Sequence, residues 1–135
     1  MDVRLINRYH SYCASLAALE KAKGRDPEDE FVLSGTVQKF ALTFDISWKV
    51  MKDIIVKYHK IQSFAAGSPR ETLRTAYSVG LIADDAWMEM LNLRNELSHD
   101  YDGSLAKESF EIITGEYIPL FQQFCEEAGK FVEQE

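Results

Sequence analysis

A long stretch of helical periodicity over about residues 27–61 constrains the fold most. Apolar side chains recur there every three or four residues, the spacing of one face of an α-helix. A second apolar set lies on a flank, so this helix is apolar over more than one face. Such a helix is either central in a bundle or shared with a second subunit. The two sets are Val37, Phe40, Phe44, Trp48, Met51, Ile55 and Tyr58, and Leu42, Ile46, Val50 and Ile54.

Local start and stop signals set the expected bounds of the first two helices. A periodic segment over 3–23 is followed by Gly24, a common helix stop. Asp26-Pro27 then predicts an N-cap and a first helical position for the long helix. Gly35 is expected to bend or loosen that helix early, since glycine costs about 1 kcal/mol relative to alanine in a helix interior.

Similar signals predict the later helices. Ser68-Pro69-Arg70-Glu71 is a capping box that opens a short helix over 69–79. Asp84 caps a helix over 84–98, and Asp102-Gly103-Ser104 starts the last one, in which Pro119 predicts a kink. No segment alternates as a strand would. The chain is therefore expected to be all-α, a single domain over 1–135 and an antiparallel up-and-down bundle of about five helices.

Composition narrows the setting of this 135-residue chain. No apolar run approaches the roughly 18 residues needed to cross a bilayer, and charges interrupt the N-terminal segment as they would not in a signal peptide. Cys13 and Cys125 lie in apolar helical patterns, which predicts two buried free thiols in a reducing cytoplasm. We therefore expect a cytoplasmic protein that does not engage a membrane.

The net charge of −7 is unevenly spread. Residues 1–74 carry a net charge of +3 and residues 75–135 carry −10. This distribution disfavours general adhesion to nucleic acid, yet allows a local basic patch in the first half and an acidic face offered to a partner. Solvated helix faces without a partner explain any single charge equally well.

Motifs of common enzyme classes are missing from the sequence. It contains no glycine-rich phosphate loop, no dinucleotide fingerprint and no nucleophile-elbow motif. The histidines at positions 10, 59 and 99 lack the spacing of a zinc site and do not pair with the cysteines. The sequence therefore predicts neither a metal nor a cofactor.

Arg94 is the one charged residue placed within an apolar arc. On a helical wheel that starts at Ala86, Arg94 falls near 80°, between Met90 and Trp87. A guanidinium stays charged and must meet a partner there. A carboxylate on a neighbouring helix, a ligand and a second chain all satisfy this requirement.

His99 and Tyr101 follow Arg94 near the end of the same predicted helix. In a regular helix His99 lies about 140° from Arg94, so the two converge only if the last turn unwinds or if a second subunit supplies one of them. The simpler interpretation makes His99 a C-terminal capping residue and Tyr101 a turn aromatic.

The spacing Arg94-x4-His99-x-Tyr101, with polar Asn95 after the arginine, resembles the signature of the HEPN superfamily. The rest of the chain resembles one branch, the nucleotidyltransferase substrate-binding proteins, over about residues 5–125. The segments that carry this resemblance are Gln38-Lys39-Phe40, Phe44-Asp45-x-x-Trp48-Lys49, Ser68-Pro69-Arg70-Glu71, Ala76 with Gly80-Leu81-Ile82, and Trp87-x-x-Met90-Leu91. Glu96-Leu97 departs from the Asn-Leu-Thr-like residues of this branch.

The resemblance implies a homodimeric helical bundle in which Arg94 and His99 of both chains face a shared cleft. It also implies a minimal nucleotidyltransferase as partner and RNA or a nucleotide as ligand. Many such proteins are metal-independent ribonuclease toxins, with the transferase as antitoxin. In some pairs the antitoxin adds AMP to the motif tyrosine, here Tyr101.

The residue chemistry suits metal-independent RNA cleavage. His99 can act as acid or base near neutral pH, Arg94 can stabilise charge on the phosphorane, and Asn95 can orient His99 or hold a phosphate oxygen. Two alternatives stay open. The chain is a non-catalytic nucleotide- or substrate-binding subunit, or it is a purely structural bundle in which Arg94 and His99 stabilise the fold.

Overall fold

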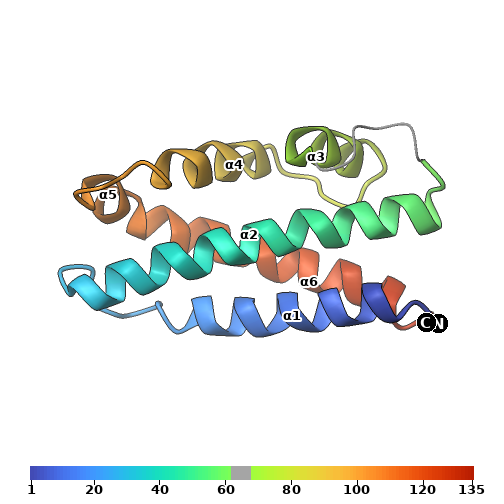
Figure 1. Cartoon of the computed structure of the whole chain (residues 1–135), viewed down its shortest axis with the longest axis horizontal. Coiled ribbons are helices and arrows are strands. Elements are labelled where there is room, and N and C mark those ends of the chain that lie inside the picture. The colour runs from blue at the N-terminus through green and yellow to red at the C-terminus, as the bar shows by residue number, and fades with distance from the viewer. Residues whose placement is uncertain (62–67) are drawn as a thin grey trace.

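The computed structural model describes residues 1–61 and 68–135, which form an antiparallel helical bundle (Figure 1). The chain runs out along α1, back along α2, out again along α3 and α4, and back through α5 and α6, so both termini lie at one end. This confirms the predicted all-α bundle. The elements are α1 (Val3–Glu20), α2 (Glu30–Tyr58), α3 (Pro69–Ser78), α4 (Ala86–Leu97), α5 (Ser104–Ile112), a π-helical turn η1 (Ile113–Tyr117) and α6 (Ile118–Val132).

The long helix α2 is the centre of the bundle. It packs against α1, α3, α4, α5 and α6. Both apolar sets predicted from the sequence are therefore used largely inside one chain: Val50 and Ile54 of the second set are fully buried. Leu42 is 43% exposed, however, and Ile46 is half-buried, so one apolar strip of α2 still reaches the surface.

The helix boundaries follow local capping chemistry, with one correction. The long helix starts at Glu30 with Asp29 as its N-cap, whereas the sequence predicted Asp26 with Pro27 at the first position. Asp29 is the N-cap because its carboxylate accepts hydrogen bonds from the backbone N–H groups of Phe31 and Val32. Asp26 instead accepts a bond from the backbone of Glu28 within the preceding turn.

Two other predicted boundaries fall close to the observed ones. The Ser68 hydroxyl accepts a bond from the Glu71 N–H at 3.4 Å, and Pro69 opens α3 as predicted. The first helix ends at Glu20, three residues before its predicted end, and residues 21–24 form a turn that closes on Gly24 in the left-handed region, at φ +75°. Gly35 does not interrupt α2, which is continuous over its full length.

The last part of the chain contains a π-helical turn just before Pro119, where the sequence predicted a kink. Proline has no backbone N–H, so it cannot bond to the carbonyl four residues earlier in a regular α-helix. The chain widens into the π-turn η1 just before it, and the Ile118 N–H bonds to the carbonyl of Ile113, five residues back. Helix α6 then resumes.

Aromatic side chains and a few satisfied polar groups fill the core. Trp87 of α4 packs edge-on against Phe121 and Phe124 of α6. The buried Tyr12 hydroxyl donates to the carbonyl of Phe121 at 2.7 Å. Between α1 and α2, the hydroxyls of Ser15 and Thr43 share a buried hydrogen bond of 2.7 Å. These bonds matter because an unsatisfied buried polar group is costly.

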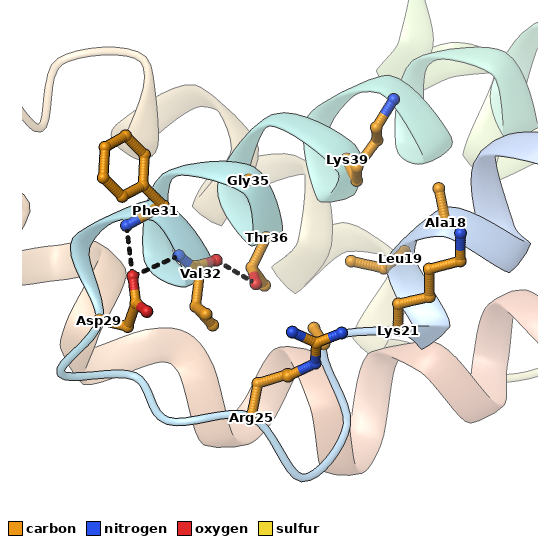
Figure 2. A pocket seen from close by; sticks show the side chains of 11 residues that line it. Ala18, Leu19, Lys21, Arg25, Asp29, Phe31, Val32, Gly35, Thr36 and Lys39 are labelled. Atoms are coloured by element: carbon orange, nitrogen blue, oxygen red, sulfur yellow. Dashed lines mark hydrogen bonds between the residues drawn. The ribbon is translucent and has the colours of Figure 1, made fainter.

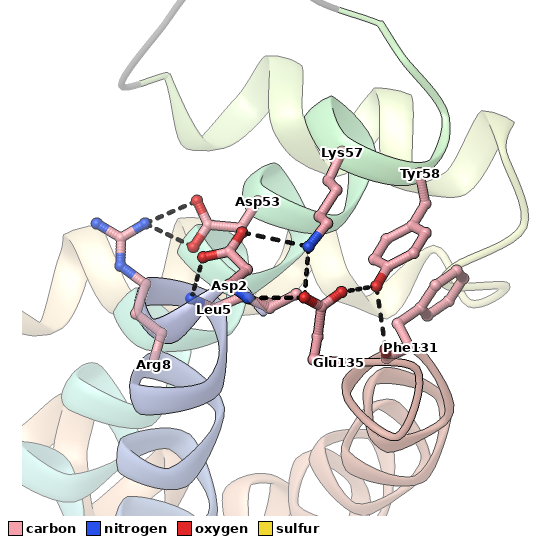
Figure 3. A network of polar contacts seen from close by, with 8 residues as sticks. All are labelled: Asp2, Leu5, Arg8, Asp53, Lys57, Tyr58, Phe131 and Glu135. Atoms are coloured by element: carbon pink, nitrogen blue, oxygen red, sulfur yellow. Dashed lines mark hydrogen bonds and ion pairs between the residues drawn. The ribbon is translucent and has the colours of Figure 1, made fainter.

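Polar contacts join the two chain ends to α2 (Figure 3). Glu135 accepts bonds from Lys57, from the Tyr58 hydroxyl and from the backbone N–H of Asp2. Nearby, Arg8 of α1 pairs with Asp53 of α2 at 2.9 Å. This network holds α1, α2 and the end of α6 together.

Cys13 of α1 and Cys125 of α6 lie side by side, with their Sγ atoms 3.4 Å apart. Both are free thiols, as predicted, but each is half-buried and not fully buried. Burial and the neighbouring Cys125 raise the pKa of the Cys13 thiol to about 11.

In the described segments, no strand occurs and no helix has the length and apolarity that a bilayer crossing requires.

Candidate functional site

The Arg94 guanidinium makes a two-point ion pair with Asp45 of α2. Its Nε donates to one carboxylate oxygen at 3.0 Å and its Nη2 to the other at 2.8 Å. This is the carboxylate on a neighbouring helix that the sequence left as one of three options. The pair is not sealed from water: the Arg94 side chain is 32% exposed and that of Asp45 is 31% exposed. The bonds to Asp45 raise the pKa of Arg94 further, so the guanidinium stays charged.

A surface depression of about 340 Å³ surrounds this ion pair. Lys49 lies one turn along α2 from Asp45, and Asn95 follows Arg94 on α4; both are exposed. Within residues 1–61 and 68–135, Lys49 forms no ion pair, and the Arg94 Nη1 atom has no hydrogen-bond partner. The depression thus offers cationic and amide donors to a ligand from solvent. Its lining residues are Phe44, Asp45, Trp48, Lys49, Pro69, Leu91, Arg94 and Asn95.

His99 lies beyond the end of α4 and is exposed. The helix end tightens instead of unwinding: the His99 N–H bonds to the carbonyl of Glu96 at 3.1 Å, and that of Asp100 to the carbonyl of Leu97 at 3.2 Å. In the described part of the chain, no hydrogen bond joins His99 to Arg94. A single chain therefore places Arg94 in α4 and His99 just after it, without a hydrogen bond between them.

Tyr101 stands on the turn between α4 and α5. Asp100 before it is an anchor, because its carboxylate accepts bonds from the backbone N–H groups of Leu105 at 3.1 Å and Ala106 at 2.8 Å. Gly103 completes the turn with φ +76°, a conformation that favours glycine. The Asp100 carboxylate thereby ties the turn to the start of α5, while the Tyr101 side chain is 91% exposed.

Asp45 and Lys49 are named in the sequence analysis only within a segment that carries the family resemblance, and it gives neither of them a role in the site. They lie four residues apart on α2, and they share an outward face with the partly exposed Leu42 and Ile46. The segment Phe44-Asp45-x-x-Trp48-Lys49 contains the signal, since both charges interrupt an apolar pattern. No periodicity argument, however, assigns Asp45 to Arg94, which lies 49 residues away.

A metal centre has no basis among the residues that the structure covers: no three His, Cys, Asp or Glu side chains gather there in a position to hold an ion. The candidate site is instead a set of donors, Arg94, Lys49 and Asn95, with an exposed imidazole and phenol further along the same helix end. Such a set suits phosphate groups, which guanidinium and amide donors bind through charge-assisted hydrogen bonds.

Comparison with known proteins identifies a matching family and a solved structure with the same fold. The family model described as nucleotidyltransferase substrate binding protein like matches residues 7–130. A crystal structure of a protein from Thermus thermophilus has the same fold with a TM-score of 0.76; it is 25% identical, and the match covers 87% of this chain and 98% of that one. No curated protein matches the sequence.

Proposed function

Because the chain belongs to the nucleotidyltransferase substrate-binding protein-like family, we propose that it is the binding partner of a nucleotidyltransferase. The family match over nearly the whole chain is the observation that carries this proposal. The partner engages the end of α4, where Tyr101 is presented on a rigid turn.

Tyr101 is the acceptor that this chain offers to the transferase. Its phenol is almost fully exposed, and the Asp100 anchor keeps the turn in place. In the transfer, the phenol oxygen bonds to the α-phosphorus of ATP bound by the transferase, the phenol proton leaves to a base, and pyrophosphate departs. The product carries AMP and an added negative charge close to His99.

The test uses a minimal nucleotidyltransferase from the same organism and ATP labelled on the α-phosphate. We expect label on the wild-type chain and none on Tyr101→Phe. Tyr77→Phe is the matched control, because Tyr77 is also exposed (51%) but lies on α3. Label retained on Tyr101→Phe, or failure of the two proteins to elute together in gel filtration, contradicts the proposal.

A second function, metal-independent RNA cleavage, is favoured by Arg94, whose side chain is 32% exposed and whose Nη1 makes no hydrogen bond to the described residues. Arg94 lines the same depression as Lys49 and Asn95, where a phosphate oxygen can accept hydrogen bonds from all three. Since one chain does not bring His99 to Arg94, this activity requires a homodimer in which His99 of one copy acts beside Arg94 of the other. The apolar strip formed by exposed Leu42 and half-buried Ile46, next to Asp45, supplies a surface for that association.

In such a dimer each residue has one chemical task. His99 takes the 2′-OH proton or protonates the leaving oxygen, and Arg94 stabilises the charge that develops on the phosphorane. Asn95 holds a phosphate oxygen or orients the imidazole. Because AMP on Tyr101 would add bulk and negative charge nearby, the first proposed function would regulate the second.

Incubation with RNA in the presence of EDTA distinguishes these functions. Cleavage by the wild type, and its loss in both Arg94→Ala and His99→Ala, is the expected result for a ribonuclease. Arg74→Ala and His10→Ala are matched controls, because both side chains are exposed and lie away from the site. Circular dichroism should show unchanged helicity in all four. Saturable nucleotide or RNA binding without cleavage leaves only the binding function; cleavage by both site variants contradicts the enzymatic one.

A further inference from the structure

Two free thiols meet where the first and last helices of the bundle pack together. Cys13 lies within α1 and Cys125 within α6, and their Sγ atoms are 3.4 Å apart. The two helices run antiparallel and pack along each other (Figure 1). A disulfide needs its sulfurs about 2.0 Å apart, so the thiols have to approach by only about 1.4 Å, a distance that side-chain rotation on facing helices can supply.

A tyrosine on α1 fixes the turn of α6 that carries Cys125. The Tyr9 hydroxyl donates to the backbone carbonyl of Cys125 at 3.1 Å and lies 3.7 Å from the Cys125 Sγ. Gly129, one turn further along α6, leaves room for this hydroxyl, because a Cβ there would lie 2.7 Å from it. Burial raises the pKa of Tyr9, so the phenol keeps the proton that it donates. The contact holds the two helices together at the level of the two sulfurs.

The surroundings of the two thiols determine how they react. Both side chains are half-buried, so a small oxidant can reach the pair from solvent. Burial, with a smaller effect of Cys125, raises the pKa of the Cys13 thiol to about 11. Because the thiolate is the reactive form of a cysteine, the first step of oxidation is slow near neutral pH. The second step is favoured by proximity, since the other sulfur is already in contact with the oxidised one.

We propose that Cys13 and Cys125 are a redox modification site, at which hydrogen peroxide converts the two thiols into a disulfide between α1 and α6. The thiolate of one cysteine attacks a peroxide oxygen and the O–O bond breaks, which leaves a sulfenic acid and, with the thiol proton, one water. The second sulfur attacks the sulfenic sulfur, the S–S bond forms, and the hydroxyl group leaves with the second thiol proton as another water. The two thiols together lose two electrons and two protons, and the peroxide is reduced.

The disulfide would join the two ends of the fold. Cys13 and Cys125 are 112 positions apart in sequence, so the bond closes a loop that contains most of the chain. A cross-link over so long a loop restricts the unfolded ensemble strongly, and the oxidised protein should unfold in urea at a midpoint higher by on the order of 1 M. The proposal is independent of the proposed function, because it uses no residue of the Arg94 depression or of the turn that carries Tyr101.

The test treats the reduced, purified protein with hydrogen peroxide. In intact-mass spectrometry the wild type should lose two hydrogen atoms, and a digest should yield one linked peptide that contains Cys13 and Cys125. Dithiothreitol should restore both thiols and the original urea midpoint. The rate should not depend on protein concentration, since the bond forms within one molecule, and it should rise between about pH 7 and about pH 10 as the thiolate forms.

Single substitutions provide the matched controls. Cys13→Ser and Cys125→Ser each keep one sulfur, so peroxide should add oxygen or link two molecules, and the urea midpoint should not rise. Tyr9→Phe should form the same disulfide more slowly than the wild type, because it lacks the hydrogen bond that holds Cys125 in place. A wild type that keeps both thiols, gains oxygen without losing hydrogen, or forms its disulfide only between molecules overturns the proposal. Since that decisive result comes from the wild type, it does not depend on the folding of any variant.

Discussion

Removing the ion pair between Asp45 and Arg94 tests whether this contact between α2 and α4 stabilises the fold. The two residues are 49 positions apart in sequence and meet through two parallel hydrogen bonds of 3.0 and 2.8 Å. The appropriate set is Asp45→Ala, Arg94→Ala and the double variant, because a double-mutant cycle isolates the interaction of the pair from the other losses of each side chain.

The expected magnitude follows from the geometry and the exposure. Fully exposed ion pairs contribute roughly 0.2–1 kcal/mol, whereas two-point arginine–carboxylate pairs are at the stronger end. With each side chain about one-third exposed, solvent still screens the charges. We therefore expect a coupling free energy of about 1 kcal/mol at low salt, and a smaller one at about 1 M salt, where the screening length is near 3 Å.

Urea unfolding followed by circular dichroism gives the four free energies of unfolding. Each single variant should be less stable than the wild type, and the double variant should be less destabilised than the sum of the two. For a domain of this size, about 1 kcal/mol corresponds to a Tm shift of roughly 3–6 °C. A coupling below about 0.3 kcal/mol, which is the usual error of additivity, would refute the structural role of the pair.

Three further predictions concern the packing of α1, α2 and α6. Gly35→Ala should stabilise the fold by about 0.5–1 kcal/mol, because the added methyl meets no atom within 4 Å and improves helix propensity. Gly129→Ala should instead destabilise it in urea unfolding, since its Cβ would lie 2.7 Å from the Tyr9 hydroxyl; in a Tyr9→Phe background this cost should disappear. Stability should fall as pH rises from about 9 to 11, because the Cys13 thiol keeps its proton in the fold up to a pKa of about 11 and loses it in the unfolded chain near 9.0; Cys13→Ser should flatten that fall in urea midpoints measured across this range.

The fold could be predicted from the sequence because its helices are specified locally. The signals are short-range: the apolar spacing of α2, the Ser68 cap and Pro69 each determine the conformation of residues only a few positions away. The error at the start of α2 is also local. Asp26-Pro27 and Asp29 both supply a cap, and the competition is decided by which backbone N–H groups the chain leaves free, here those of Phe31 and Val32.

The candidate site was only partly predictable, because its contacts are long-range. A wheel identifies Arg94 as a charge in an apolar arc and so requires a partner, but it does not name Asp45. The geometry of the α4 end decides the position of His99, since two bonds tighten the last turn and keep the imidazole at the surface. Helical periodicity does not encode such a choice. The exposure of Tyr101, in contrast, follows from its place in a turn.

The position of α2 in the bundle explains how an acidic chain can present basic surfaces. Some of the positive charge of residues 1–74 lines two surface depressions, one on each side of this helix. Lys39 lines a depression between the end of α1 and the start of α2 (Figure 2), and Lys49 lines the Arg94 depression on the α4 side. Since unlike charges elsewhere in the molecule act over about a screening length of 8–10 Å, each surface keeps a local potential that the net charge of −7 does not cancel. If the Arg94 depression binds a phosphate ligand as proposed, its affinity should fall with added salt, and it should fall less steeply in Arg94→Ala.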